Sequence, residues 1–307
     1  MVIHLKIGEF MKYNRPKRIH FDISEISFGG WQLGNNIDFN DCDDELARSL
    51  VEEAFRQGIT LFDTAPNYGH GQSERILGRA LKEVRNKVFI SSKFGHSDQG
   101  AIDFSVNRLE SSVRGSLARL QTDYLDCLLL HNPPQEMLSK SHPIYIELKR
   151  LNRKGLIKFF GVSIDTSDEL AEVLKNDDID AIEIMYNMIH QSPKIWFNQI
   201  ADKGILLMIK VPLDSGWLTG KYDESTEFMG IRKRWTKDVI KTRVKIVNQI
   251  KSIVGEDMVC ASLRFILDHP AVTCVIPGSR NVEQLNSNLK ASSYKLDPSK
   301  YIDIETK

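Results

Sequence analysis

Short apolar runs alternate with amphipathic stretches along almost the whole chain. Eight runs have the length of β-strands, namely residues 23–28, 59–64, 87–93, 126–131, 159–164, 181–187, 205–211 and 272–278. Most are continuously apolar, which is typical of strands in a parallel sheet that is covered on both faces. The stretches between them predict helices. Leu46, Leu50, Ala54 and Phe55 recur at helical spacing, and Thr166 precedes Glu169 as in a capping box.

Eight strand–helix units without an intervening linker predict a (β/α)8 barrel, the TIM barrel, with its active site at the carboxyl ends of the strands. A doubly wound sheet is the competing architecture, but no GxGxxG follows the first strand and no boundary divides the chain. We expect a single domain over residues 11–307. Residues 1–10 precede a second methionine and are interpreted as an N-terminal extension or a remnant of cloning. The polar segment 218–238 is interpreted equally as an active-site lid or as disorder.

Composition narrows the classes of partner. The 307 residues include 41 Lys and Arg against 41 Asp and Glu, so net charge gives no reason to expect nucleic acid or an anionic membrane surface. No apolar run reaches the ~20 residues needed to cross a bilayer. The four cysteines form no CxxC pair and have no zinc-binding spacing. We therefore expect reduced thiols, no metal site and a cytoplasmic location.

Polar side chains finish three consecutive apolar runs. Asp63, Lys93 and His131 end the second, third and fourth runs, and Tyr68 lies in the loop after Asp63. Singly, each has an ordinary explanation as a turn former, a solvated lysine or a loop residue. Together they fit carbonyl reduction, in which Tyr68 donates a proton, Lys93 lowers the pKa of Tyr68, Asp63 keeps Lys93 charged and His131 orients the carbonyl oxygen.

Several segments in order along the chain resemble the aldo-keto reductase family, in particular its bacterial branches. They are "FDTAPNYGHGQSERILGRAL", "SSKFG", "LLLHNP", "PLDSGWLTGKY" and "IPGSRNVEQLNSN". The resemblance implies a catalytic tetrad of Asp63, Tyr68, Lys93 and His131, with Tyr68 as the general acid. It also implies that the barrel binds NADPH without a dinucleotide-binding fold, with NADH as the alternative cofactor.

The resemblance assigns cofactor contacts to three regions of the chain. It implies nicotinamide contacts for Ser163, Glu183 and Lys210, although Ile164 replaces a usual asparagine and Glu183 a glutamine. It implies a pyrophosphate loop made of Pro212, Leu213, Ser215, Leu218, Gly220 and Lys221, and an adenosine site made of Gly278, Ser279, Arg280, Gln284 and Asn288. Arg280 could bind the 2′-phosphate through its forked donors, although Gly278 and Gln284 replace basic residues of some NADPH-selective branches.

Four loop residues are candidates for the wall of a substrate pocket, namely Trp31, His70, Asn132 and Trp217, and each is explained equally well by packing. The leading function is reduction of a small-molecule aldehyde or ketone by an NADP(H)-dependent oxidoreductase. A nucleotide-binding regulatory barrel with little turnover is the first alternative. An aldolase-type barrel with Lys93 as a Schiff-base nucleophile is the second. We expect a monomer or a small homo-oligomer.

Overall fold

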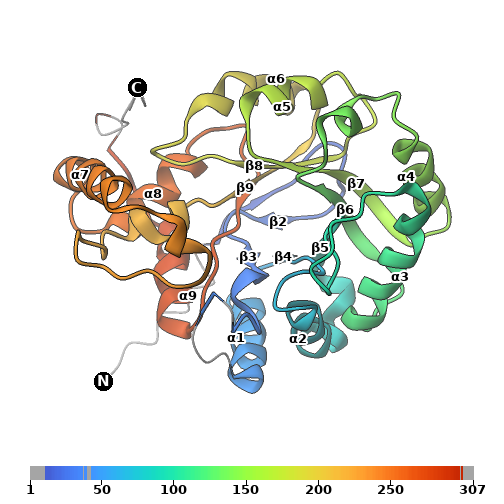
Figure 1. The fold of residues 1–307 in the computed structure, drawn as a ribbon, viewed down its shortest axis with the longest axis horizontal. Helices are drawn as coiled ribbons and strands as arrows, with labels where there is room; N and C mark the ends of the chain where they lie inside the picture. The colour runs from blue at the N-terminus through green and yellow to red at the C-terminus, as the bar shows by residue number, and fades with distance from the viewer. Residues whose placement is uncertain (1–10, 37, 40–42, 298, 300–307) are drawn as a thin grey trace.

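The computed structural model describes residues 11–36, 38–39, 43–297 and 299. Residues 1–10, interpreted above as an extension, lie outside this part of the chain. Within it, eight parallel strands follow one another in chain order around the molecule (Figure 1). They are β3 (Phe28–Gly29), β4 (Leu61–Asp63), β5 (Phe89–Phe94), β6 (Leu125–His131), β7 (Ile157–Ile164), β8 (Ala181–Met185), β9 (Leu206–Lys210) and β10 (Cys274–Val275).

The two edges of this sheet meet and close it. Parallel bridges join Ile26 to Val275 and Gly29 to Gly278. The amide of Ser27 donates to the carbonyl of Val275 at 2.9 Å, across the same seam. The predicted (β/α)8 barrel is therefore confirmed.

Side chains of alternate residues point into the barrel, because a strand has a period of two. Leu61, Phe89, Cys127, Leu129 and Met208 belong to one buried cluster that fills the interior. Their strand neighbours belong to a second, larger cluster between the sheet and the helices. Towards the carboxyl ends of the strands, the last inward-pointing residues are polar. They are Asp63, Lys93, His131, Ser163, Glu183 and Lys210. The barrel thus has an apolar floor and a polar uppermost layer.

Helices surround the strands (Figure 1). They are α1 (Asp44–Arg56), α2 (Gln72–Leu81), α3 (Leu109–Leu120), α4 (Ile144–Arg153), α5 (Ser167–Val173), α6 (Phe197–Asp202), α7 (Lys237–Val254), α8 (Met258–Leu267) and α9 (Val282–Leu289). The predicted capping box at Thr166 and Glu169 is present at the start of α5. The apolar stripe predicted for α1 is partly wrong, because Leu46 is 72% exposed whereas Leu50 and Ala54 are buried.

The first predicted strand, 23–28, is split in two. Ile23–Ser24 forms β2, which pairs antiparallel with β1 (Tyr13–Asn14), and the barrel strand β3 begins only at Phe28. Ile23 and Ile19 join the interior cluster of the barrel. The N-terminal hairpin therefore closes the floor of the barrel instead of extending its wall.

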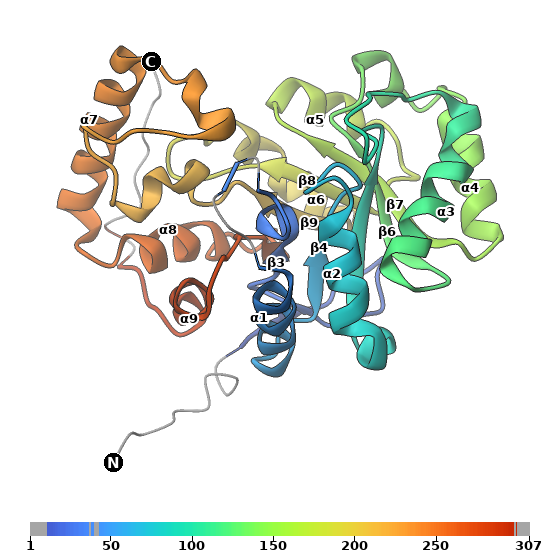
Figure 2. The ribbon, with the colours of Figure 1, turned by 60° about the horizontal axis from the view of Figure 1, so that its bottom comes forward.

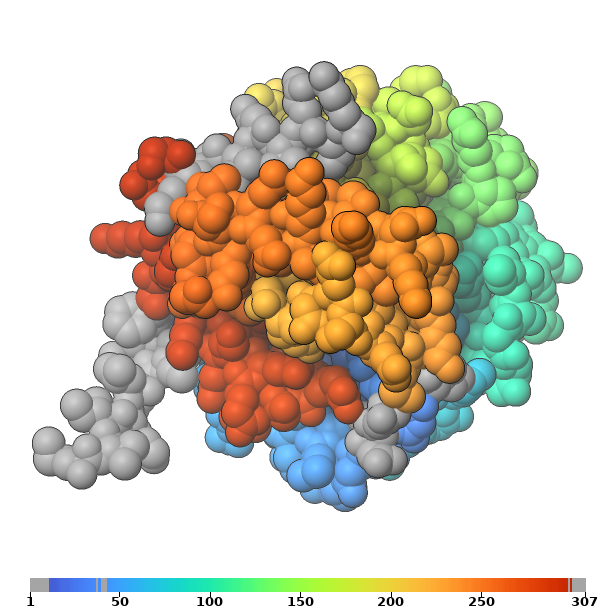
Figure 3. Space-filling model, turned by 60° about the vertical axis from the view of Figure 1, so that its left-hand side comes forward, coloured from blue at the N-terminus to red at the C-terminus, as the bar shows by residue number. Residues whose placement is uncertain are grey.

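Residues 211–236, called here the β9–α7 connection, contain most of the polar segment 218–238 that was interpreted as a lid or as disorder, and its last two residues begin α7. The structure gives it two short 3-10 helices, η7 (Asp214–Thr219) and η8 (Gly230–Arg234). The rings of Trp217, Tyr222, Phe228 and Trp235 pack against one another, with neighbouring centroids about 5 Å apart. Helix α7 follows beside α8 (Figure 2), and the gold and orange atoms of this region form a continuous surface (Figure 3). Within the described ranges, no helix is long and apolar enough to cross a membrane.

Candidate active site

Lys93 lies at the centre of the polar layer, between two carboxyl groups. Its Nζ is 2.5 Å from Asp63 Oδ2 and 3.4 Å from Glu183 Oε2, and it donates to the carbonyl of Thr64 at 3.1 Å. The lysine is 1% exposed. Burial alone would lower the pKa of Lys93, but Asp63 and Glu183 outweigh it and hold that pKa above its ordinary value. Lys93 is therefore a charged lysine.

Tyr68 lies over this cation, in the loop between β4 and α2. Lys93 Nζ is 5.1 Å from the centroid of the Tyr68 ring. Burial raises the pKa of the Tyr68 hydroxyl, and Lys93 opposes that rise without cancelling it. The sequence-based mechanism named the effect of Lys93 in the right direction but left out burial, which is the larger effect. Tyr68 is accordingly protonated at neutral pH, as a proton donor must be.

His131 completes this group at the end of β6. Its ring meets that of Tyr68 edge-on at 5.9 Å and stacks on the ring of His96 at 4.6 Å. Burial lowers the pKa of His131 well below its ordinary value, and the nearby Lys93 and His96 act in the same direction, so the imidazole is neutral. Its Nδ1 is buried without a hydrogen-bond partner among the described residues. His96, three residues after Lys93, was not predicted from the sequence.

The residues predicted for the nicotinamide end form one network beside Lys93. The Ser163 hydroxyl donates to Glu183 Oε1 at 2.8 Å, and Lys210 Nζ donates to that hydroxyl at 2.9 Å. Lys210 also donates to Asn132 Oδ1 at 3.0 Å and pairs with Asp165 at 2.9 Å. The network joins the ends of β6, β7, β8 and β9, and it holds the buried Ser163 hydroxyl and Glu183 carboxyl group at the carboxyl end of the barrel.

The residues predicted to hold the pyrophosphate lie in the first part of the β9–α7 connection. The backbone there is irregular, since Val211, Asp214 and Ser215 have positive φ angles of 52°, 46° and 56°. Such a conformation is uncommon for residues other than glycine, and for a β-branched valine it is an outlier. Asp214 is held by Arg243, whose Nη1 lies 2.5 Å from Asp214 Oδ2. Pro212 and Leu213 precede η7, Leu218 lies within it, and Gly220 and Lys221 follow it.

The residues predicted for the adenosine end lie between β10 and α9. Asn288 donates to the Ser279 hydroxyl at 3.0 Å, and both are buried. The Arg280 amide donates to Gln284 Oε1 at 2.9 Å. Gly278 packs against the side chain of Gln32, where a Cβ atom would lie 2.0 Å from the Gln32 amide group. A side chain at this position would therefore require the Gln32 side chain to move.

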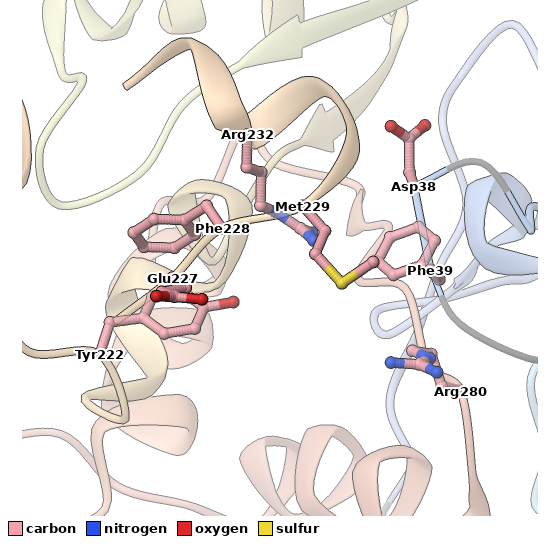
Figure 4. A pocket seen from close by; sticks show the side chains of 8 residues that line it. All are labelled: Asp38, Phe39, Tyr222, Glu227, Phe228, Met229, Arg232 and Arg280. Atoms are coloured by element: carbon pink, nitrogen blue, oxygen red, sulfur yellow. The ribbon is translucent and has the colours of Figure 1, made fainter. Parts of the chain in front are cut away.

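Next to Arg280 lies a cavity of about 170 Å³ that is lined by Asp38, Phe39, Tyr222, Glu227, Phe228, Met229, Arg232 and Arg280. In Figure 4, Arg232 and Arg280 approach Phe39 from different sides. The guanidinium carbons lie 4.9 Å and 5.4 Å from its ring centroid. Arg232 Nε is buried without a hydrogen-bond partner in the described part of the chain. Sequence reasoning missed Phe39 and Arg232, because they come from loops that meet only in the closed barrel.

The four residues predicted for a substrate pocket are dispersed. Trp31 packs against Phe39 at 5.2 Å, and Asn132 belongs to the Lys210 network. His70 is exposed, and its Nδ1 lies 2.9 Å from the carbonyl of Asp98. Trp217 is 1% exposed inside the aromatic cluster of the β9–α7 connection, so it presents no surface to a substrate. Over the described ranges, no group of three His, Cys, Asp or Glu side chains could hold a metal ion.

The sequence model of the aldo/keto reductase family matches residues 25–307. The chain belongs to this family. Among its curated relatives, the aldo-keto reductase YhdN of Bacillus subtilis (strain 168) is 29% identical, with 96% of this chain and 93% of the relative covered. The NADH-specific methylglyoxal reductase of Escherichia coli (strain K12) is 25% identical, with 89% of this chain and 91% of the relative covered.

Solved structures agree with this assignment. The holo form of the aldo-keto reductase AKR11C1 from Bacillus halodurans is 25% identical and superposes with a TM-score of 0.78, covering 95% of this chain and 94% of that chain. The protein is thus an aldo/keto reductase-family oxidoreductase with a (β/α)8 barrel. Members of the family generally use nicotinamide cofactors, and they act on small molecules.

Proposed function

We propose that the protein reduces an aldehyde or ketone to the alcohol, with a nicotinamide nucleotide as the hydride donor. One observation carries this proposal: the buried, charged Lys93 lies directly beneath the protonated Tyr68, at the mouth of the barrel. A carbonyl that accepts hydride gains negative charge on its oxygen, and a proton donor beside that oxygen stabilises the transition state. Tyr68 provides the proton, and Lys93 stabilises the phenolate that remains.

Each neighbour has a distinct part in this reaction. Asp63 keeps Lys93 charged and in place through the 2.5 Å contact. The neutral His131 donates a hydrogen bond to the carbonyl oxygen and so aligns it with Tyr68. His96 fixes the plane of the His131 ring by stacking on it. Two carboxyl groups around Lys93 also argue against the aldolase alternative, because a Schiff-base lysine must lose its proton to attack.

The cofactor fits the groups that the barrel mouth offers. Ser163 and Glu183 give a hydroxyl and a carboxyl oxygen to the nicotinamide carboxamide, and Lys221 provides a positive charge in the pyrophosphate loop. Arg232 has unsatisfied donor capacity beside Arg280, and an arginine fork suits a phosphate monoester. This favours NADPH, whose 2′-phosphate distinguishes it from NADH. The buried free thiols Cys127, Cys260 and Cys274 fit a reducing, cytoplasmic setting.

A fluorescence titration with NADPH and with NADH tests the nucleotide site. The wild-type protein should bind NADPH more tightly than NADH, and Arg280→Ala should weaken NADPH far more than NADH. Lys233→Ala is the matched control, because Lys233 is an exposed cation of the same region that does not line the cavity. Failure of the wild type to bind either nucleotide would refute the proposal. Binding without turnover of any aldehyde or ketone would favour the regulatory alternative.

A further inference from the structure

Two carboxyl oxygen atoms beside Lys93 accept no hydrogen bond, although one of them, Glu183 Oε2, lies 3.4 Å from Lys93 Nζ. Asp63 Oδ1 and Glu183 Oε2 are buried and have no hydrogen-bond partner among the described residues. The other oxygen of each carboxyl group is satisfied, since Lys93 donates to Asp63 Oδ2 and Ser163 donates to Glu183 Oε1. Buried acceptors without a donor are rare in native proteins because each costs about 1–3 kcal/mol. Two of them at one site call for a common explanation.

The two carboxyl groups lie within hydrogen-bonding reach of each other. Two ionised carboxylates have only acceptors and repel, whereas one proton between them makes a hydrogen bond that satisfies both groups. Asp63 and Glu183 are 3% and 2% exposed, so water does not weaken that repulsion. Burial and the neighbouring Glu183 both raise the pKa of Asp63.

The charges that face this pair come from several strands. Lys93 on β5 contacts both carboxyl groups. Lys210 on β9 donates to Ser163 and pairs with Asp165, and its charge also lowers the pKa of Glu183 without contacting the carboxyl group. Tyr68 is protonated and His131 neutral, as described above. Burial raises the pKa of the Cys127 and Cys274 thiols on β6 and β10, so they carry no charge. The contacting cation, Lys93, is therefore balanced by one negative charge on the two carboxyl groups, not by two.

We propose that Asp63 and Glu183 share one proton, and that Glu183 is thereby a positioning residue for Lys93. The cluster of the pair and Lys93 is then neutral. The shared proton is also a second transferable proton, in addition to that of the Tyr68 hydroxyl. The sequence had suggested only a cofactor contact for Glu183.

The part that the shared proton takes in turnover rests on the proposed function. After hydride adds to the carbonyl carbon, three proton transfers follow. The Tyr68 O–H bond breaks as the new alcohol O–H bond forms. A Lys93 N–H bond breaks as the Tyr68 hydroxyl is restored, and the shared proton moves to Lys93. The pair ends as two carboxylates and regains its proton from water, so that each turnover consumes one hydride and one proton.

Infrared spectroscopy of the nucleotide-free protein at neutral pH tests the shared proton. The carbonyl stretch of a protonated carboxylic acid should be present in the wild type and absent from Glu183→Gln and from Asp63→Asn. Both substitutions are isosteric, and both leave a single carboxyl group that ionises beside Lys93. Glu25→Gln is the matched control and should keep the band, because buried Glu25 is paired with Arg264 at 3.3 Å and accepts from Ser292. A wild-type spectrum identical to that of Glu183→Gln in this region would overturn the proposal.

The pH dependence of unfolding gives a second readout. The unfolded chain loses both protons above about pH 5, whereas the folded pair keeps one. Stability from the pair is therefore present at low pH and is lost as the pH rises. The folding equilibrium constant of the wild type should fall about tenfold per pH unit, relative to Glu183→Gln, between about pH 5 and pH 7. Parallel curves for the two proteins would contradict the shared proton. Neither measurement uses a nucleotide or a substrate, so a failed reductase assay would leave this test intact.

Discussion

Replacing Lys93 by methionine removes the cation beneath Tyr68 while keeping an unbranched side chain that is one atom shorter. Lys93 Nζ is 5.1 Å from the centroid of the Tyr68 ring, and two unit charges at that separation interact by about 3 kcal/mol at an effective dielectric constant of 20. This energy stabilises the phenolate as the proton leaves. Because about 1.4 kcal/mol corresponds to a factor of ten in rate, Lys93→Met should lower kcat roughly 10²-fold.

The assay is the oxidation of NADPH with an aldehyde that the wild-type protein reduces, at saturating nucleotide. The chain contains a matched control. Lys158 Nζ lies 2.9 Å from Asp126 Oδ1 and 3.9 Å from the centroid of the Tyr124 ring, but at the opposite, amino-terminal end of the barrel strands. Lys158→Met should therefore retain full turnover. If the two variants reduced the aldehyde at similar rates, the role given to Lys93 would be refuted.

Three further predictions concern other parts of the molecule. Because burial raises the pKa of Tyr68, the pH profile of kcat for reduction should stay level through neutral pH and decline only above the usual tyrosine range, while alcohol oxidation should rise with pH; a decline near neutrality would contradict this. Arg232→Met should weaken NADPH about 10- to 100-fold and NADH little in a titration, and equal losses would remove Arg232 from the phosphate site. Gly161→Ala should lower the free energy of unfolding, measured with denaturant, by about 3 kcal/mol or more, because its Cβ would lie 1.8 Å from the Ala181 carbonyl oxygen. An unchanged free energy of unfolding would show that β7 and β8 separate easily at this point.

The barrel could be predicted from the sequence because its strands are buried on both faces and so remain apolar throughout. The same pattern misled at residues 23–28, where Ile23 is equally apolar whether it plugs the floor of the barrel or joins its wall. Leu46 misled for a related reason, since helical spacing identifies a stripe of residues without showing how far it reaches around the helix. In both cases the outcome depends on tertiary packing, which the local sequence pattern does not contain.

The candidate site likewise consists of residues that the sequence predicted and of contacts that it could not predict. Asp63, Lys93 and His131 were predicted because each ends an apolar run, and strand ends in a barrel converge. The contact of Glu183 with Lys93 crosses the barrel from β8 to β5, so no local pattern reports it. Arg232 meets Phe39 only because the β9–α7 connection returns over the loop that follows β3.

The most direct test of the central claim is a single-turnover reaction of the wild type and Tyr68→Phe, each loaded with NADPH and mixed with the same aldehyde. The phenyl ring keeps the edge-on contact with His131 but has no proton to give. We expect the variant to bind NADPH as the wild type does and to transfer hydride roughly 10²- to 10⁴-fold more slowly. Equal hydride-transfer rates in the two proteins would show that Tyr68 is not the proton donor.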